Sequence, residues 1–433
     1  MSLTTVSKIN IGHPTPLQTE LRRGSARLWN NMVRLHKFIR KRHWKWPFKG
    51  DFEKHFKGKY ALHSQTIQAL IKKFFANIET TSVNRKEGDK KARYPYRDRK
   101  HFQIVMYKAS AIKKKGNRLI LSNGNGAKKR IVRIPKNIPL GKIIGAELGF
   151  RELRLTLKQD IDAVKSAGSN IVAADLGVIH HAAMTDGDTS EIIVGRGLRS
   201  LVQYRNKKLA DFSMLLSKCK KGSRRQGKLR IAKAKMLFRN DNQQRNFLHH
   251  ASKKMIEYCV NKEAGTLVVG DCINMSKNAR KNKKGSRRSN QMNSSNPLGQ
   301  LLTYLKYKGK FKGVKLEKIG EQYTTQTCPK CGHRHKPSGR NYQCKNPECD
   351  FIGVRDLVGA ANIKNKYENG IIKPNQVLPP LMAKYLRVVK MPVIRPPVVV
   401  HLTDGMLLDN TLDMAQVLSS TGGKTPSERF LVA

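Results

Sequence analysis

The sequence predicts an α/β protein in which a strongly basic N-terminal region precedes a domain built on a sheet. The segment "NIVAADLGVIHHAAMTDGDTSEIIV", which begins at Asn170, has the pattern of two strands, an Asp-Gly turn and a third strand. A long polar helical region follows from about Gly197 to Asn261, is broken at "KKGSRRQG", and leads into the short buried strand "TLVVGD". Strands and helices in this arrangement indicate an α/β domain that begins near Asn170.

The net charge limits the class of partner. The 433 residues include 86 Lys and Arg against 30 Asp and Glu, a formal charge of +56. Such a charge repels itself in a compact chain unless a counterion is bound, so we expect a polyanion, and nucleic acid rather than a membrane. The apolar runs are too short to span a bilayer.

The N-terminal segment "MSLTTVSKINIGHPTPLQ" has no apolar core of the kind found in signal peptides. We therefore expect a reducing interior compartment, and in a prokaryotic host a cytoplasmic, nucleoid-associated protein. In such a compartment the seven cysteines are expected to be metal ligands and core residues rather than disulfides.

The N-terminal region combines amphipathic helices with an acid-free basic stretch. From Ser25 to Ile39 apolar residues recur at helical spacing behind a Ser cap, and "SQTIQALIKKFFANIETTS" is a second predicted helix. Between Arg99 and Ala146 there are 13 Lys or Arg and no acidic residue, interleaved with Phe102, Tyr107 and the strand-like runs "RLILS" and "RIVRI". This pattern favours a surface that follows nucleic-acid phosphates over a merely solvated face.

The second domain contains further predicted elements. Its long helix has a core stripe made of Leu248, Ala251, Met255 and Cys259. The neighbouring His249 and His250 are expected to pack or contact phosphate, because no Glu or Cys lies at a ligand spacing from them. "LLTYLKYKGK" is a predicted helix and "GVKLEKIG" a predicted strand.

Two polar or irregular segments flank these elements. The Lys/Arg-rich loop from Lys277 to Arg288 is expected to be ordered only by a polyanion, as a lid over nucleic acid near the active site. The tail from about Glu368 is rich in Pro and Val, and it is expected to be appended or partly disordered, without a functional signal.

Four cysteines predict a zinc ribbon. Cys328 and Cys331 form a Cys-x-x-Cys pair, and Cys344 and Cys349 form a second pair across a basic hairpin. Four thiolates can surround Zn²⁺ at about 2.3 Å and leave no open position for water, so this zinc would stabilise a fold and do no chemistry. His333 and His335 are possible substitute ligands, and the remaining thiols are expected in the core or at the surface: Cys219, Cys259 and Cys272.

Two acidic residues stand in unusual surroundings. Asp175 ends the apolar run "IVAAD", where an ionised carboxylate is costly unless it is paired or binds a cation. Asp356 opens a predicted helix whose small residues Gly359, Ala360 and Ala361 permit close packing against a sheet. The alternatives are an Arg-paired core residue for Asp175 and a helix N-cap for Asp356.

Taken in order, these motifs resemble the RuvC-type nuclease half of the TnpB family, which are transposon-encoded RNA-guided DNA endonucleases related to type V CRISPR effectors and Fanzor proteins. The resemblance rests on "IVAADLG", "TLVVGD", "YTTQTCPKCG" and "VRDLVGAANI". It implies an RNase H-like (RuvC) nuclease fold with an inserted zinc ribbon, and an N-terminal mixed β-barrel (wedge-like) with a helical recognition domain. In the family three carboxylates bind divalent metal. Asp175 matches the first of them and Asp356 the last.

The second family motif usually carries a Glu, but here the stretch "VVGD" has Gly270 in its place. Asp271 is the next residue, and one step along a strand turns a side chain to the opposite face, so it is the weaker substitute. Glu321 in "GEQYTTQTC" is favoured, because some TnpB branches and Fanzor proteins resemble this chain in having a relocated Glu upstream of the ribbon. The alternative is that Glu321 is an ordinary exposed residue and the site is impaired.

The resemblance and the chemistry of phosphodiester hydrolysis imply the cofactors and partners. Two Mg²⁺ ions, or Mn²⁺, are expected, with Asp175 bridging them and Glu321 and Asp356 each binding one. The implied partners are a guide RNA and target double-stranded DNA, with the protein a monomer in complex with RNA. The expected domains are a basic nucleic-acid recognition domain (1–165), the nuclease domain (166–325 and 350–367), the zinc ribbon (326–349) and the tail (368–433).

Three functions remain in competition on the sequence. The first is the RNA-guided endonuclease, and the second is a catalytically inactive RNA-guided DNA-binding repressor, which the missing Glu makes plausible. The third is a zinc-ribbon RNA-binding or ribosomal protein, for which the charge would be natural. The third leaves Asp175 and "VRDLVGAANI" unexplained, and Mg²⁺-dependent nicking separates the first function from the others.

Overall fold

The computed structural model describes residues 2–89, 91–124, 126–135, 141–160, 164–271, 286–379 and 382–388. The chain divides into two compact units, Met1–Val164 and Lys165–Ala433. No helix of the described ranges combines the length and apolarity needed to cross a membrane.

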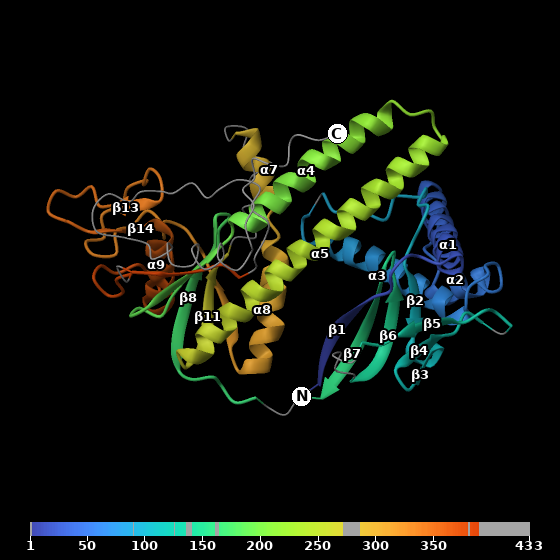
Figure 1. Cartoon of the computed structure of the whole chain (residues 1–433), viewed down its shortest axis with the longest axis horizontal. Coiled ribbons are helices and arrows are strands. Elements are labelled where there is room, and N and C mark those ends of the chain that lie inside the picture. The colour runs from blue at the N-terminus through green and yellow to red at the C-terminus, as the bar shows by residue number, and fades with distance from the viewer. Residues whose placement is uncertain are drawn as a thin grey trace, which may run out of the picture. The chain divides into compact units, whose positions relative to one another are not determined.

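The described residues of the first unit form three α-helices, one short 3₁₀ helix (Ala109–Ala111) and seven strands around a shared core (Figure 1). The helices are α1 (Pro16–Lys41), α2 (Lys49–Phe56) and α3 (Ser64–Lys86). A four-stranded sheet has the order β1-β7-β6-β2, and a three-stranded sheet the order β3-β4-β5. The strands are β1 (Ser2–Asn10), β2 (Val105–Lys108), β3 (Ile112–Lys115), β4 (Arg118–Leu121), β5 (Arg130–Arg133), β6 (Lys142–Leu148) and β7 (Glu152–Asp160).

The first predicted helix exists but begins earlier than expected. Thr15 is its N-cap, with a side chain that accepts a hydrogen bond from the Gln18 N–H at 3.2 Å, and Pro16 occupies the first helical position. Ser25 is not a cap, because it is buried within α1. The Thr15 side chain accepts a hydrogen bond from an N–H of the first turn, and the ring of Pro16 holds φ near the helical value. A Ser within a continuing apolar stripe has neither role at a helix start.

The second unit is built on one six-stranded sheet in the order β12-β11-β8-β9-β10-β15. The first three strands in sequence pair antiparallel, whereas β11 pairs parallel with β8 and β12 pairs parallel with β11. The strands are β8 (Asn170–Asp175), β9 (His180–Thr185), β10 (Ser190–Val194), β11 (Ala264–Gly270), β12 (Lys315–Ile319) and β15 (Lys384–Leu386).

The edge strand β15 corrects an expectation about the tail. Its residues pair parallel with β10, with Ile192 opposite Tyr385. The sequence placed this segment in an appended tail outside the nuclease domain, because three residues after a Pro-rich stretch have no periodicity that predicts a strand. The rest of the tail beyond 388 lies outside the described residues.

The helices α5 (Arg224–Asn261) and α8 (Leu298–Lys312) cover one face of this sheet, and α9 (Arg355–Asn369) covers the other. The helix α4 (Arg196–Ser217) packs along α5, and α7 (Arg287–Ser295) packs against α4. Val172, Ala174 and Val269 point to the face where α5 and α8 pack, and the predicted stripe of α5 lies in that core. Ala173 and Val268 point to the opposite face and pack against Ile363 of α9. The alternation of strand side chains thus separates two cores.

The ribbon lies between β12 and α9 in the sequence. It contains the short antiparallel pair β13 (Asn341–Gln343) and β14 (Ile352–Val354). Tyr342 is fully buried among the four cysteines, together with Val358 from α9. The ribbon therefore packs directly on the helix that carries Asp356.

Candidate metal centres

Asp175 lies at the end of β8 on the face covered by α9. By strand alternation its side chain shares a face with Ala173, and its backbone partner on β9 is Ala183. Gly359 of α9 approaches so closely that a Cβ on it would lie 2.6 Å from Asp175 Oδ2. A larger residue at 359 would therefore displace the carboxylate. The small residues predicted to permit close packing do so at this point.

Asp356 lies in the first turn of α9 and meets two partners. Its Oδ2 is 2.7 Å from His180 Nδ1 at the start of β9. Its Oδ1 accepts hydrogen bonds from Arg355 Nε at 3.3 Å and Nη2 at 3.2 Å. The alternative of an N-cap is wrong, because Val354 is the N-cap residue and makes no side-chain capping bond.

Glu321 follows β12 by two residues and occupies the space above Gly270. The last pair of the β11–β12 ladder joins Gly270 to Ile319, which brings the following loop back over the end of β11. A Cβ on Gly270 would overlap the Cγ, Cδ and Oε1 atoms of Glu321. Since Val269 pairs with Ala174, Gly270 lies beside Asp175 at the next position of the ladder. Glu321 thus brings a carboxylate to the place where a side chain at 270 would project.

Asp271 continues the backbone pairing beyond the strand. Its N–H donates to the Ile319 carbonyl at 2.8 Å. By alternation its side chain is directed away from the face that Ala173 and Val268 share.

The electrostatics indicate that these carboxylates are neighbours. Asp175 as a residue is only partly buried, but its carboxylate is enclosed, and burial raises its pKa to about 8, helped by the charges of Asp356 and Glu321. The guanidinium of Arg355 opposes this only in part, since its hydrogen bonds go to Asp356. For Asp356, burial alone would raise the pKa, but His180 and Arg355 outweigh it and lower the pKa. A site that pushes a carboxyl pKa upward through like charges is one that a cation stabilises.

The donor set fits a hard divalent cation. Three carboxylates from β8, the loop after β12 and α9 meet at one end of the sheet, and Mg²⁺ and Mn²⁺ prefer oxygen ligands.

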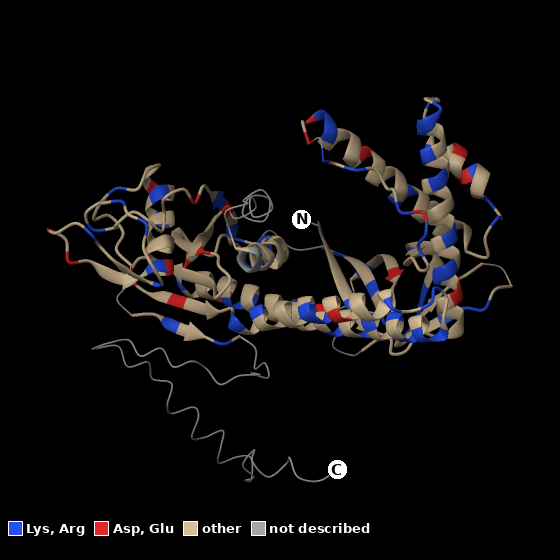
Figure 2. Ribbon diagram, turned by 90° about the horizontal axis from the view of Figure 1, so that it is seen from above, with Lys and Arg blue, Asp and Glu red and all other residues tan. Residues whose placement is uncertain are grey.

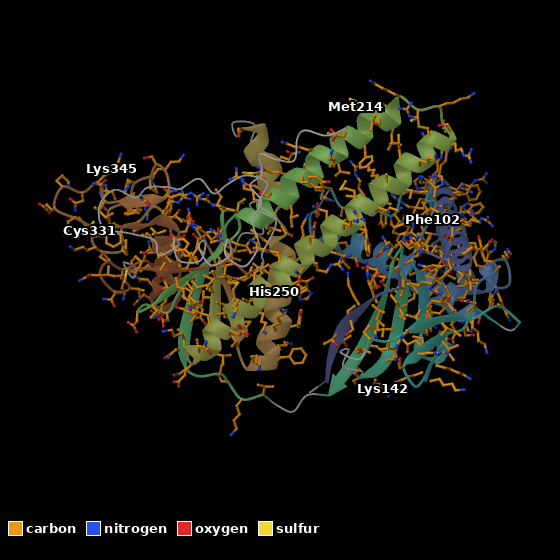
Figure 3. All side chains as sticks on the ribbon, viewed as in Figure 1. Phe102, Lys142, Met214, His250, Cys331 and Lys345 are labelled. Carbon is orange, nitrogen blue, oxygen red and sulfur yellow. The ribbon has the colours of Figure 1, made fainter. Side chains whose placement is uncertain are left out.

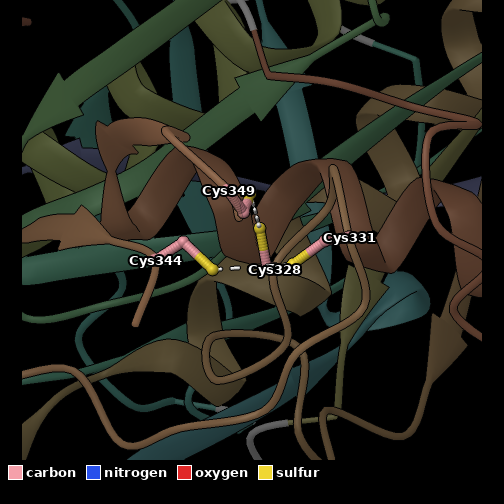
Figure 4. A group of neighbouring side chains, drawn as sticks. All are labelled: Cys328, Cys331, Cys344 and Cys349. Atoms are coloured by element: carbon pink, nitrogen blue, oxygen red, sulfur yellow. Dashed lines mark hydrogen bonds between the residues drawn. The ribbon is translucent and has the colours of Figure 1, made fainter. Parts of the chain in front are cut away.

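The four ribbon cysteines form the second candidate centre (Figure 4). The Sγ atoms of Cys328 and Cys349 are 3.9 Å apart, and those of Cys331 and Cys344 are 3.5 Å apart. A tetrahedron with a Zn–S distance of about 2.3 Å has sulfurs about 3.8 Å apart, so this geometry fits zinc. Backbone N–H groups of His333 and Asn346 point at Cys331 and Cys344, which favours their thiolates.

We expect one zinc per chain, measured by elemental mass spectrometry, and its loss in Cys331→Ser. Structural zinc contributes on the order of 10 kcal/mol to folding of small sites, so Cys331→Ser should also lower the melting temperature of the second unit. Cys219→Ser is the matched control, because Cys219 lies in the turn between α4 and α5, outside the cluster. Full zinc content in Cys331→Ser would contradict the assignment.

The other predicted thiols and ligands are placed as follows. Cys259 is buried in the core between α5 and the sheet, and Cys219 is half-buried. His333 and His335 stack on one another beside the cluster, with His335 against Tyr342. Cys272 and residues 277–285 of the predicted lid lie outside the described residues.

The first unit carries a candidate nucleic-acid surface (Figures 2 and 3). An open groove of about 630 Å³ is lined by Tyr96 to Gln103. Phe102, labelled in Figure 3, is 43 % exposed, and the guanidinium groups of Arg22 and Arg23 lie 5.1 and 5.8 Å from its ring centre. Cationic groups over an exposed ring can bind a phosphate chain and stack a base.

No pattern in the sequence singles out His180. It is separated from Asp356 by 176 positions and meets it only because β9 lies beside β8 under α9. One weaker sequence feature could have identified it. The pair His180–His181 begins a strand five residues after Asp175, and strand alternation puts the two side chains on opposite faces.

The sequence predicts that His249 packs or contacts phosphate, and in the structure it is a packing residue. Its ring stacks on Tyr304 of α8 with centres 4.1 Å apart, and burial followed by the charge of Lys308 lowers its pKa to about 4. His250, labelled in Figure 3, is exposed.

Comparison with known proteins gives two family matches and a curated relative. Residues 155–279 match the model described as probable transposase (OrfB_IS605), and residues 299–363 match the model described as Cas12f1-like, TNB domain. The TnpB-like protein MJ0751 of Methanocaldococcus jannaschii is 29% identical over 152 residues, which cover 35% of this chain and 52% of that protein. The matched part thus spans about half the length of this relative.

Solved structures show a partial likeness. The Cas12f1 chain of a Cas12f1-sgRNA-target DNA complex is 14% identical with a TM-score of 0.35, covering 84% of this chain and 100% of that one. The mini-RNA-guided endonuclease CRISPR-Cas_phi3 is 9% identical with a TM-score of 0.45, covering 88% and 94%. Asp175 lies within the first of these family matches, and Glu321 and Asp356 lie within the second. The two family models and the curated relative thus make this chain similar to TnpB-like proteins.

Proposed function

We propose that this protein is a metal-dependent, RNA-guided DNA endonuclease that hydrolyses phosphodiester bonds of target DNA with a guide RNA derived from the transposon end. The observation that carries the proposal is the meeting of Asp175, Glu321 and Asp356 at one end of one sheet, with Glu321 in the space above Gly270. An inactive protein would not need a second carboxylate in the space that a side chain at 270 would occupy. The position of Glu321 therefore favours a retained metal site.

The sheet order supports an RNase H-like (RuvC) fold for the nuclease domain. Three antiparallel strands in sequence order, followed by two parallel strands added beside the first, form the arrangement that this fold requires. We assign 166–325 and 355–367 to this domain and 1–165 to the wedge-like recognition domain. The ribbon is assigned 326–354 rather than 326–349, because β14 pairs with β13 of the ribbon. The segment from 368 begins within α9 and contacts this domain and the ribbon through Lys373, Asn375 and β15.

The residues divide the work of hydrolysis. When bound, two Mg²⁺ or Mn²⁺ ions would neutralise the phosphate charge and lower the pKa of the attacking water. Asp175, whose carboxylate is affected by the charges of both Asp356 and Glu321, would be the ligand shared by the two ions. Glu321 and Asp356 are assigned to one ion each. Asp356 is kept ionised by His180 and Arg355, so it is ready to bind a cation at neutral pH.

Sequence choice is assigned to base pairing, with the protein holding the backbone. The charge of +56 and the ring-and-guanidinium groove of the first unit suit contacts to phosphates and unpaired bases. The proposed partners are guide RNA and target double-stranded DNA bound by a monomer. A basic surface of this kind gives affinity and leaves the choice of sequence to the guide.

The test is guide-directed cleavage. The chain would be purified with candidate guide RNA from its flanking locus and given a target library in Mg²⁺. We expect wild type to cut, and Asp175→Asn and Asp356→Asn to bind the target without cutting. Asp188→Asn, an exposed carboxylate in the β9–β10 turn, is the matched control and should cut normally.

The other outcomes identify the competing functions. If wild type binds guide and target tightly but never cuts, the protein is an RNA-guided repressor and the endonuclease proposal is wrong. If it binds RNA without any guide-dependent binding to DNA, it is an RNA-binding protein of another kind.

A further inference from the structure

His180 and Asp356 form a buried pair that the proposed reaction does not itself require. Their Nδ1 and Oδ2 atoms are 2.7 Å apart, and the two side chains are 11% and 17% exposed. An ionised carboxylate can only accept hydrogen bonds, so His180 Nδ1 carries the hydrogen. The orientation of the ring is therefore fixed by Asp356, and the position of Oδ2 by the ring.

Both oxygens of the Asp356 carboxylate are held by hydrogen bonds, Oδ2 by His180 and Oδ1 by Arg355. Arg355 donates two hydrogen bonds to Oδ1, and its Nη1 is anchored on the Gly339 carbonyl of the ribbon at 2.6 Å. With one oxygen bonded to a guanidinium and the other to an imidazole, the carboxylate cannot rotate about its terminal bond. The lone pairs that remain are presented in a single direction.

A third element supports the ring of His180. Tyr385 of β15 lies edge-to-face against it, with ring centres 5.7 Å apart and an angle of 65° between the rings. Tyr385 also packs with the apolar cluster of Ala183, Ile192 and Leu357, the last of which follows Asp356 on α9. The strand after α9 thus returns to the sheet at the position of the His180–Asp356 pair.

We propose that His180 is a positioning residue for Asp356, and that Tyr385 of β15 holds the His180 ring in place. The proposal rests on the proposed function, in that Asp356 must be a metal ligand. Hydrogen-bonding partners behind metal ligands usually contribute 10–100-fold to metal affinity. The segment after α9 is then a working part of the centre rather than an appended tail.

The test measures metal binding directly. Mn²⁺ binding to the RNA-free full-length protein would be followed by electron paramagnetic resonance, since RNA itself binds Mn²⁺. We expect His180→Ala to weaken binding by about 10–100-fold. His180→Asn, whose amide can still donate to Asp356, should recover most of the affinity. His250→Ala, an exposed histidine on α5, should bind as wild type does.

Tyr385 gives an independent arm. Tyr385→Leu removes the ring contact and should weaken Mn²⁺ binding by about two- to tenfold, whereas Tyr385→Phe keeps the ring and should leave it nearly unchanged. In cleavage assays the His180 variants should need more Mn²⁺ for half-maximal rate, and the rate at saturating Mn²⁺ should change less. A merely structural role would not produce this split.

The outcomes separate the two proposals. If wild type binds no Mn²⁺, or if Asp175→Asn binds Mn²⁺ as tightly as wild type does, the proposed function is wrong. If wild type binds and His180→Ala binds equally well, the positioning role is wrong. If His180→Ala does not fold, the difference between Tyr385→Leu and Tyr385→Phe decides, since both variants leave His180 in place. Equal affinities in those two variants would overturn the proposal.

Discussion

Glu321→Gln is expected to abolish guide-directed cleavage while leaving guide and target binding intact. The substitution keeps the volume over Gly270 and removes the charge that holds a cation. A bound ion supplies several kcal/mol of transition-state stabilisation, so the cleavage rate should fall by about 10³-fold. Asp271→Asn should cut at close to the wild-type rate, because Asp271 continues the backbone ladder and points away from Asp175.

A transplanted carboxylate gives a stricter version of this test. A side chain at 270 would overlap Glu321, so Gly270→Glu alone should damage the site. In a Glu321→Ala background the space occupied by the Glu321 side chain is free. Adding Gly270→Glu to that variant should restore a substantial part of the cleavage rate. Loss of activity in Asp271→Asn, with Glu321→Gln unaffected, would return the second ligand to Asp271.

The second large effect is on stability as a function of pH. Burial and the charges of Asp356 and Glu321 raise the pKa of Asp175 to about 8 in the folded protein, against an ordinary value near 3.8. Between these two values the folded chain holds a proton that the unfolded chain has released. The associated stability is therefore fully present below about pH 4 and is lost as the pH rises toward 8.

Thermal melts in buffer without added divalent ions should show this loss. From pH 5 to pH 8 we expect the second unit to lose on the order of 2 kcal/mol or more, which is roughly 4–8 °C. Asp175→Asn should flatten the dependence and raise the melting temperature at pH 8, and added Mg²⁺ should do the same to wild type. Asp188→Asn should behave as wild type does. An Asp175→Asn profile that still falls with pH would assign the loss to other groups.

Strand alternation carried most of what could be predicted about the centre. The strands containing Asp175 and Gly270, the strand before Glu321 and the helix containing Asp356 are all present. The first two are short apolar runs typical of buried strands. The start of α1 was missed because a Ser within the apolar stripe resembled a cap, while Thr15 and Pro16 lay ahead of the stripe. Local patterns located elements well and their ends less well.

The contacts that no local pattern encodes were missed. His180 and Tyr385 meet because β9, β10 and β15 are neighbours in one sheet, and a three-residue strand such as β15 is too short to show a period. The overlap of Glu321 with the space above Gly270 depends on the length of one loop. Pattern resemblance suggested Glu321, but only the folded chain gives the distance between the two positions.

The pairing of Gly270 with Glu321 bears on how related chains are classified. A survey that inspects a single alignment column for Glu would record this chain as a lost nuclease, although a carboxylate from the adjacent loop occupies the space beside that column. Gly at that column is informative in itself, since any larger residue would exclude the side chain that crosses it. Glycine in the second motif together with an acidic residue just upstream of the ribbon is then a joint signature, and chains that carry both belong among the candidates for activity rather than among the degenerate copies.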